Sequence, residues 1–524
     1  MKRIVTNRII RLVSLFLLLA ISLRWFYPWS EMPRINIEQR PKTENARAAT
    51  EWYVSPEGVQ TNTGSINSPW NLTYALAGAG GSIQPGDTVW LRGGTYGDGT
   101  TRFTSNIDGT DGNRITVRQY PNERATIDGQ LWIEGSNWTD YWGFDIMHPT
   151  WGGEGNVSAS RDSCVWAISS AHVRFINMAV HDCPGGNGIG FWSTATDSDI
   201  YGSLVYSVGD HGHGIYTQNA DGSRKTIKDS VVFNNTKFGV HAYTENGYVR
   251  HYDYEGNTFF LNDYGEALLA GRTSGADINF IGNYLYNPLT GVDHNGVQFG
   301  YSNDHENMVF RDNYLAMLAG WQLISNKFAQ VDVQYNTIIG RRMARRHPPD
   351  TGMISEVWDN NDYWQVWEDY GFNNGSAYVE WPDWRTTTNY DPNSTWINHT
   401  RPAYTEPTLP TENKIFVRPN QFESGRANII VYNWNHSSSV AVDVSGVLSN
   451  NDQYEVRNVL DYFGTPTTSG RYTESTINIP MTTTATGPEF GTFVLTSTPA
   501  AYHTIIPSVS GQGSLSISSP TQVL

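Results

Sequence analysis

Phe175-Ile-Asn177 is the first of seven copies of a short phrase that recurs through the middle of the chain. Each copy begins with apolar residues and ends in Asn or Ser. The other copies are Ile200-Tyr-Gly-Ser203, Ile227-Lys-Asp-Ser230, Tyr254-Glu-Gly-Asn257, Phe280-Ile-Gly-Asn283, Phe310-Arg-Asp-Asn313 and Val333-Gln-Tyr-Asn336. The last residues of successive copies lie 23 to 30 positions apart, and a repeat of this size indicates a solenoid or a propeller.

The repeat length separates these architectures. A propeller blade needs about forty residues, and leucine-rich repeats need a regular Leu that is missing here. The pattern instead predicts an all-β fold, a right-handed parallel β-helix with three short strands per coil joined by polar bends. Asn and Ser suit such bends because they tolerate left-handed backbone. The recurrence of Asn257, Asn283, Asn313 and Asn336 at one position also fits a ladder of stacked side chains.

Composition limits the partners of the chain. The 524 residues carry a formal net charge of −16, only 16% are charged, and 13% are aromatic. This acidic balance argues against a general nucleic-acid binder, which needs basic surface to neutralise phosphates. A surface of Asn, Thr, Ser, Gly and aromatic rings is typical of an extracellular all-β protein.

The first fifty residues predict export. Basic residues precede an uncharged apolar run from Leu12 to Leu23, which is short for a membrane span and right for the core of a signal peptide. Residues 1–50 are therefore interpreted as an export signal, or as an N-terminal membrane anchor, followed by a linker. The chain is expected to be secreted or held at the cell surface. Cys164 and Cys183 then either form one disulfide or stay as two buried thiols.

The rest of the chain divides by pattern. Residues 51–412 are assigned to the β-helix, with irregular last coils from about residue 343. Residues 413–498 contain six alternating strand patterns, which predict a small C-terminal antiparallel β-sandwich. Residues 499–524 are rich in Ser and Pro and are expected to form a flexible tail.

Several stretches near the start of the β-helix carry a family resemblance. They are Trp52-Tyr-Val-Ser-Pro-Glu-Gly58, Asn67-Ser-Pro-Trp70, Pro85-Gly-Asp-Thr-Val-Trp-Leu-Arg-Gly-Gly-Thr-Tyr96, Ile115-Thr-Val-Arg-Gln-Tyr-Pro121 and Ile127-Asp-Gly129. Residues 52–128 resemble the opening of β-helix enzymes related to pectate lyase and chondroitinase B. The resemblance implies a polysaccharide substrate, and it supplies no contiguous catalytic motif.

Chemistry-bearing residues gather on the third strand of successive coils. If Ile189, Ile215, Val240 and Val297 face inward, alternate residues face outward. One outward column then contains Tyr216, His241 and Gln298, and the next contains Trp192, Gln218 and Tyr243. Together with the bends that precede the strands, these columns bring polar and aromatic side chains from about four coils onto one face. The set is Trp192, His213, Tyr216, Gln218, Lys237, His241, Tyr243, Glu266, His294 and Gln298, with Arg272 just after the fourth strand. Each alone could be a surface residue or part of a ring ladder, so the hypothesis depends on their coincidence.

This constellation suits a lyase acting on a uronate-containing polysaccharide. Such a lyase neutralises the carboxylate, removes the adjacent proton and protonates the leaving oxygen. Arg272 or a bound Ca²⁺ would neutralise, His241 or Lys237 would be the base, and Tyr216 or His213 the acid. No loop has EF-hand spacing, and the metal ligands stay unassigned. The substrate-binding set is Trp192, Gln218, Tyr243, Glu266, His294 and Gln298.

Three alternatives stay open. A glycoside hydrolase would use paired carboxylates, for which Asp182, Asp210, Glu266 and Asp293 are candidates. Gly212-His-Gly214 is similar to a polygalacturonase motif, but the aspartates expected in the coils before it are missing. An epimerase would share the proton abstraction of a lyase. A non-catalytic adhesin or glycan-binding protein would need the rings but not the titratable groups.

Overall fold

The computed structural model describes residues 48–147, 163–209, 212–244, 247–288, 294–366, 370–398, 409–473, 476–481, 489–498, 503–505 and 521–523. Contacts divide the chain into residues 1–48 and 49–524, and the second unit holds the described structure. The predicted export signal and most of the predicted tail lie outside the described residues. None of the helices in the described ranges has the length and apolarity needed to cross a bilayer.

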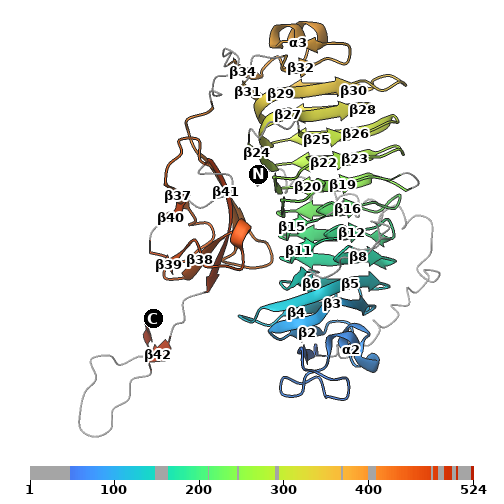
Figure 1. Ribbon diagram of the computed structural model, residues 1–524, viewed down its shortest axis with the longest axis vertical. Helices are drawn as coiled ribbons and strands as arrows, with labels where there is room; N and C mark the ends of the chain where they lie inside the picture. Colours follow the sequence, from blue (N-terminus) through green and yellow to red (C-terminus); the bar gives the residue numbers. More distant parts are fainter. Residues whose placement is uncertain are drawn as a thin grey trace, which may run out of the picture. The chain divides into compact units, whose positions relative to one another are not determined.

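Three stacks of short parallel strands form a β-helix (Figure 1). Each strand pairs with the equivalent strand of the next coil, so the chain advances one rung per coil. The first stack is β1 (Glu51–Val54), β2 (Thr88–Leu91), β4 (Ile115–Gln119), β6 (Thr139–Trp142), β10 (Arg174–Ile176), β14 (Ser198–Tyr201), β17 (Lys225–Lys228), β20 (Arg250–Glu255), β23 (Ala276–Ile281), β26 (His305–Arg311), β28 (Phe328–Gln334) and β30 (Ser355–Asp359).

The second and third stacks share their long strands. Both contain parts of β3 (Gly94–Ser105), β5 (Ala125–Glu134), β27 (Tyr314–Asn326) and β29 (Thr337–His347). The second stack adds β7 (Asp145–Met147), β11 (Ala179–Cys183), β15 (Leu204–Val208), β18 (Val231–Phe233), β21 (Thr258–Phe260), β24 (Tyr284–Asn287), β31 (Asp362–Gln365) and β34 (Thr395–Asn398). The third adds β8 (Val165–Ile168), β12 (Ile189–Phe191), β16 (Ile215–Thr217), β19 (Phe238–Ala242), β22 (Gly265–Leu269), β25 (Asn295–Phe299), β32 (Phe372–Asn373) and the antiparallel β33 (Tyr378–Val379).

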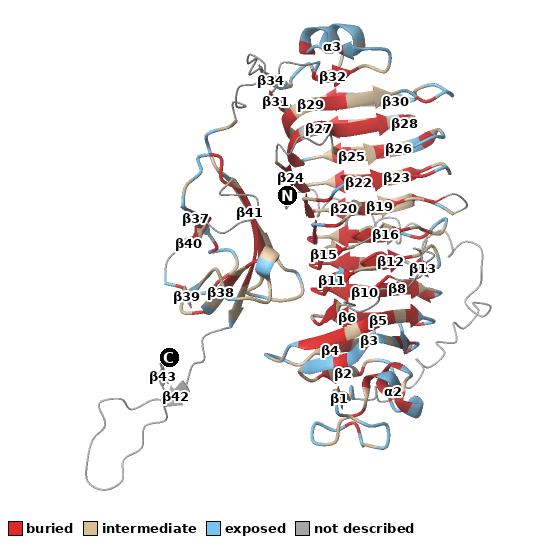
Figure 2. Ribbon diagram, in the orientation of Figure 1, coloured by how far each residue is buried: buried red, intermediate tan, exposed pale blue. Residues whose placement is uncertain are grey.

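The β-helix core follows the repeat predicted from the sequence. One continuous cluster of buried apolar side chains runs from Val54 to Trp384, and Figure 2 shows buried residues along every stack. At the bends, the predicted asparagine ladder is present. Asn283 accepts hydrogen bonds from the backbone N–H and Nδ2 of Asn257 at 2.9 and 3.0 Å, and Asn313 and Asn336 continue the same pattern.

Short elements close and decorate the coils. The helix α2 (Leu72–Leu76) begins after Asn71, whose side chain accepts a hydrogen bond from the backbone N–H of Tyr74. The 3-10 turn η1 (Ala79–Gly81) follows it, and α3 (Trp381–Thr388) lies among the last coils. Two further strands, β9 (Ser170–Ala171) and β13 (Ala195–Thr196), pair at a bend.

The C-terminal strands form the predicted sandwich. One antiparallel sheet contains β35 (Lys414–Pro419), β36 (Ala427–Tyr432), β41 (Phe490–Thr498), β38 (Gln453–Asn458) and β39 (Thr468–Arg471), with the turn η2 (Val459–Asp461) after β38. The second sheet pairs β37 (Ser439–Asp443) with β40 (Thr476–Pro480), and the two sheets share one apolar core. The sequence pattern did not reveal β39. A short pair, β42 (His503–Ile505) and β43 (Thr521–Val523), follows.

The sandwich and the β-helix also share a buried cluster on the second stack. Phe260 and Tyr286 of the β-helix pack with Phe490 of the sandwich. The Tyr432 hydroxyl donates to the carbonyl oxygen of Leu285 at 3.0 Å, and Arg418 pairs with Asp229 at 2.7 Å. These contacts are made by second-stack strands and the neighbouring bends.

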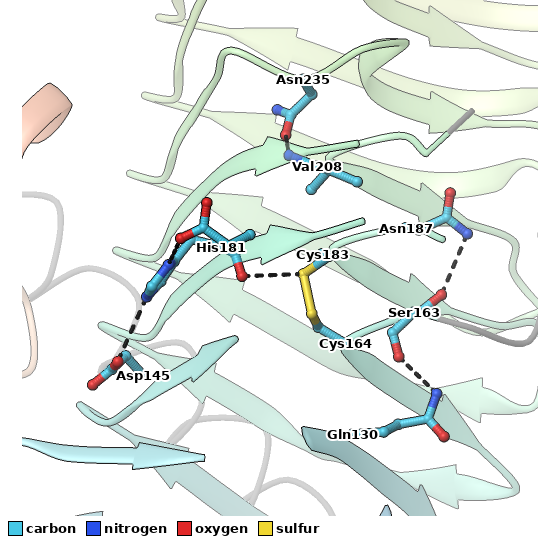
Figure 3. The surroundings of a disulfide bond; sticks show 10 residues. Gln130, Asp145, Ser163, Cys164, His181, Cys183, Asn187, Val208 and Asn235 are labelled. Carbon is cyan, nitrogen blue, oxygen red and sulfur yellow. Dashed lines mark hydrogen bonds and ion pairs between the residues drawn. A yellow bond between two sulfur atoms is a disulfide. The ribbon is translucent and has the colours of Figure 1, made fainter. Parts of the chain in front are cut away.

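The two cysteines form a disulfide between Cys164, just before β8, and Cys183, at the end of β11 (Figure 3). Both are buried in the core. The bridge decides between the two alternatives left open by the sequence, and a disulfide persists in oxidising compartments outside the cytosol.

Candidate functional site

The outward columns predicted from the sequence are formed on the third stack. Ile189, Ile215, Val240 and Val297 are all 0% exposed and face the core. Tyr216 of β16 pairs in register with His241 of β19. His241 pairs with Leu268, and Leu268 pairs with Gln298. The column therefore contains Tyr216, His241 and Gln298 as predicted, with a nearly buried Leu268 between the last two.

A ladder of aromatic rings leads along this column toward His241. Trp132 and Trp166 stack with ring centroids 5.0 Å apart, and the next residue in register is Gly190. The indole of Trp192 fills the gap over Gly190, because a Cβ there would lie 2.9 Å from the indole nitrogen. Trp192 thereby contacts Trp166 at 4.6 Å and Tyr216 at 5.1 Å. Neighbouring rings cover much of these ring faces, so stacking stabilises the coils.

Two histidines form a hydrogen-bonded pair at the end of the ladder. The backbone N–H of Phe238 donates to Nδ1 of His213 at 3.2 Å, so the neutral His213 ring carries its proton on Nε2. That Nε2–H donates to Nδ1 of His241 at 2.9 Å. The proton of the neutral His241 ring therefore lies on Nε2, and His241 presents an N–H donor rather than a lone pair.

Both histidines are neutral at physiological pH. Burial, together with the neighbouring His241 and Lys237, lowers the pKa of His213 to about 2. Burial also lowers the pKa of His241 to about 3. The hydrogen-bond pattern of the pair is therefore retained across neutral and mildly acidic pH.

Tyr216 is held in place by backbone and side-chain hydrogen bonds. Its hydroxyl donates to the carbonyl oxygen of Tyr243 at 2.9 Å and accepts from Nε2 of Gln218 at 3.2 Å. Its ring meets the edge of His241 at a centroid distance of 5.3 Å. Because the hydroxyl proton is engaged by a carbonyl, Tyr216 is better placed to position His241 than to release a proton.

Two cations flank the histidine pair. Lys237 precedes Phe238, and its Nζ lies 3.8 Å from the ring centroid of Tyr264. Arg272 follows β22, where its backbone N–H donates to the carbonyl oxygen of Thr244 at 3.0 Å, and the residue is exposed. Lys237 thus precedes β19, which carries His241, and Arg272 follows the neighbouring parallel strand β22 at the opposite end of this pair.

A buried lysine that the sequence did not single out supports the same region from inside. Lys225 of β17 is 0% exposed. Its Nζ donates to the carbonyl oxygens of Phe191, Trp192 and Gln218 at 3.0, 2.7 and 2.6 Å. The three carbonyl oxygens surround a lysine head group whose pKa burial lowers well below its ordinary value. Lys225 therefore fixes the backbone from which Trp192 and Gln218 project.

The structure contradicts the assignment of Glu266 to the substrate-binding set. The side chain of Glu266 is 0% exposed and accepts a hydrogen bond from Nδ2 of Asn262. Burial raises its pKa to about 8, so the carboxyl group is neutral at pH 7. Glu266 faces the interior because it extends the ladder of Asn235 and Asn262 at this bend.

Of the other candidate carboxylates, the structure describes only Asp182, which lies on the second stack. Asp182 accepts a hydrogen bond from Nδ1 of His181 at 2.7 Å, and the ring of His181 contacts Phe463 of the C-terminal region. Asp210 and Asp293 lie outside the described residues. Within the described ranges, no group of three or more His, Cys, Asp or Glu side chains is placed to hold a metal ion, and Ca²⁺ stays a hypothesis.

His294 and Gln298 lie on the following coil. Both are half-buried, and Nε2 of Gln298 donates to the carbonyl oxygen of Gly300 at 3.0 Å. Their role in substrate binding stays a prediction, as do those of Trp192, Gln218 and Tyr243.

Two exposed tyrosines near the pair were missed in the sequence. Tyr264 and Tyr301 are 56% and 52% exposed. The Tyr264 ring contacts Phe238, and the Tyr301 ring contacts Tyr243. Both lie in bends rather than strands, so strand alternation gave no signal for them.

The first half of the β-helix matches a known family. Residues 52–248 match the family described as Pel9A-like, right handed beta helix region. Pectate lyase L of Dickeya dadantii (strain 3937) is 30% identical over 166 residues, which cover 29% of this chain and 36% of that protein. This chain thus spans about a third of the length of that relative.

Solved structures that are similar to this chain include pectate lyase Pel9A, with a TM-score of 0.36 and 15% identity over 63% of this chain and 81% of that one. A glycoside hydrolase gives a TM-score of 0.48 and 11% identity over 64% of this chain and 100% of that one. The parallel strand stacks of the structure agree with the family match, which describes residues 52–248 as similar to a right-handed β-helix region.

Proposed function

We propose that this protein is a secreted or cell-surface polysaccharide lyase that cleaves a uronate-containing polymer by β-elimination. The observation that carries the proposal is the neutral His213–His241 pair on an outer face, with Lys237 just before β19 and Arg272 after the neighbouring β22. The similarity to a protein named Pectate lyase L supports the substrate class. The disulfide supports a location outside the cytosol.

The tautomers of the histidine pair support the following roles within this proposal. His241 has its proton on Nε2, so it acts as a hydrogen-bond donor to a substrate oxygen, and His213 is a positioning residue. Lys237 is then the base, and Arg272 pairs with the uronate carboxylate. The Lys237 amine removes the proton next to the carboxylate, the carbon–oxygen bond breaks as the double bond forms, and the proton passes to the leaving oxygen.

A hydrolase fits the described residues less well. It needs two carboxyl groups about 5 to 9 Å apart across the scissile bond. Of the four candidates, Glu266 is enclosed in the interior and Asp182 is engaged by His181. The lyase is therefore the function that the described geometry supports best.

The test follows both products of cleavage. The purified protein is incubated with polygalacturonate, alginate and neutral polysaccharides while ultraviolet absorbance from unsaturated ends and new reducing ends are measured. We expect both to rise together on an acidic polymer. Lys237→Ala should lower kcat by about 100-fold or more, which is typical for the loss of a general base. Lys228→Ala is the matched control, because Lys228 lies on the first stack and pairs with Glu255.

Two other outcomes would contradict the lyase, and a third would contradict only the role given to Lys237. Reducing ends without unsaturated ends would make the protein a hydrolase. If neither unsaturated ends nor reducing ends increased while the protein bound a polymer, it would be a glycan-binding protein. Full activity in Lys237→Ala would remove the base assignment while leaving the reaction class standing.

A further inference from the structure

Five aromatic rings form a row that passes through the candidate site. Three of them, Phe238, His241 and Tyr243, come from β19 and the residue after it. Tyr264 contacts Phe238 with ring centroids 6.0 Å apart, and Phe238 lies 5.2 Å from His241. His241 lies 5.0 Å from Tyr243, which contacts Tyr301 at 5.9 Å. The row therefore follows the direction of the strand and crosses the ring ladder.

The ends of this row differ from its middle in exposure. Tyr264 and Tyr301 are more than half exposed, whereas the rings between them are half-buried. Tyr264 lies just before β22 and Tyr301 just after β25, so the two tyrosines flank opposite ends of the strands. A five-residue strand spans roughly 16 Å, which is longer than a single sugar ring.

The rings of the ladder are less suited to binding a sugar than the two exposed tyrosines. Trp166 is only 8% exposed, and its ring lies between those of Trp132 and Trp192. A sugar needs an open ring face with solvent beside it, because the apolar face of the sugar must displace water from the ring. In this part of the described structure, Tyr264 and Tyr301 offer the most exposed rings.

We propose that Tyr264 and Tyr301 bind the sugar units on either side of the bond acted on at His241 and Lys237, so that the polymer lies along β19 and crosses the strand stack. The inference deepens the proposed function, and it rests on that function for the position of the reacting bond. The ligand class is a pyranose polymer with an apolar face on its sugar rings. Lys237, whose Nζ lies 3.8 Å from the ring centroid of Tyr264, marks the end of the row at which the proton would be removed.

Binding and turnover are measured separately, so that this inference and the proposed function can fail independently. Affinity electrophoresis in gels containing polygalacturonate or alginate reports binding without cleavage. We expect Tyr264→Ala and Tyr301→Ala each to weaken binding by about tenfold, and to raise KM far more than they lower kcat. Tyr264→Phe and Tyr301→Phe should restore binding, because the ring rather than the hydroxyl makes the contact.

Tyr335→Ala is the matched control. Tyr335 is 54% exposed and lies between β28 and β29, away from the third stack. Its variant should bind like the unaltered protein. A second measurement uses oligosaccharides of increasing length. For chains long enough to reach both tyrosines, the double variant Tyr264→Ala/Tyr301→Ala should lose more affinity than either single variant. For shorter chains, it should lose no more than the single variants do.

The results separate the two ideas. Weaker binding in both alanine variants with rescue by Phe supports the two sugar-binding positions, even if no cleavage is seen and the lyase proposal, with the position of the reacting bond, fails. Unchanged affinity in Tyr264→Ala and Tyr301→Ala, or an equal loss in Tyr335→Ala, overturns the inference while leaving the lyase assay to stand on its own result. Failure of Phe to restore binding would move the contact to the hydroxyl groups and contradict ring stacking.

Discussion

At the residue scale, single atoms decide what the outer face can do. The backbone N–H of Phe238 fixes the tautomer of His213, and through it the tautomer of His241. The missing Cβ of Gly190 gives the indole of Trp192 its place in the ladder. Neither effect changes the fold, yet the first turns His241 from a candidate base into a hydrogen-bond donor.

The lowered pKa values of the histidine pair predict how stability depends on pH. In the folded state His213 and His241 stay neutral down to a pH of about 3, whereas in the unfolded chain they gain protons below about 6.5. The unfolded state therefore binds more protons in this window. The stability contribution of the pair is fully present above pH 6.5 and is lost as the pH falls.

Urea unfolding at several pH values between 7 and 4 checks this prediction. For His213→Asn and His241→Asn, we expect the free energy of unfolding to fall less steeply with acidification, by about 1 kcal/mol per pH unit for each histidine. His181→Asn is an informative contrast. Burial alone would lower the pKa of His181, but hydrogen bonds to Asp145 and Asp182 raise it, so its contribution is lost as the pH rises. The burial argument would be contradicted if the free energy of unfolding depended on pH equally in the unaltered protein, His213→Asn and His241→Asn.

At the element scale, polar ladders at the bends hold successive coils in register. Nδ2 of Asn283 donates to the carbonyl oxygen of Tyr254 at 2.9 Å, while its Oδ1 accepts from Asn257. Each asparagine thus satisfies buried backbone groups of the preceding coil. This is why one residue type recurs at one position of the repeat.

Removal of one rung should be costly. Asn283→Ala leaves the backbone N–H of Asn257 and the carbonyl of Tyr254 without partners in the interior. We expect the free energy of unfolding to fall by about 3 kcal/mol, because each unsatisfied buried group costs about 1 to 3 kcal/mol. Chemical denaturation measures the change. Asn67→Ala, at an exposed asparagine, should stay within about 0.5 kcal/mol of the unaltered protein. A similar value for Asn283→Ala would show that the asparagines serve only as bend formers.

At the scale of the whole molecule, covalent and apolar links join parts that are distant in sequence. The disulfide closes a loop with a sequence separation of 19 between third-stack and second-stack strands. The shared cluster around Tyr286, Tyr432 and Phe490 joins the β-helix and the sandwich on the second stack. The candidate site is built from the third stack and its bends.

The disulfide should contribute measurably to global stability. Closure of a loop of this length removes entropy from the unfolded chain worth about 3 kcal/mol. We expect the double variant Cys164→Ala/Cys183→Ala to melt at a lower temperature than the oxidised protein in differential scanning calorimetry. Reductant should lower the Tm of the unaltered protein toward that of the variant and leave the variant unchanged. Equal melting temperatures for variant and oxidised protein would refute a stabilising role.

The sequence by itself determined the parallel β-helix, the sandwich and the outward column that holds Tyr216 and His241. Repeat length and strand alternation are local properties, because each coil uses the same pattern of apolar strands and polar bends. Stacking of identical coils then places equivalent residues side by side without further information. The residues quoted for the family resemblance pointed to the same fold.

Only the tertiary structure decided how the side chains meet at the bends. Glu266, the second residue of β22 beside the bend, turns inward to extend the ladder of Asn262, at a position where other coils have Gly. Tyr264 and Tyr301 reach the row of rings from two different coils. The physical reason is that a bend has no fixed side-chain period, so the direction of each residue depends on hydrogen bonds to coils some 25 to 30 residues away.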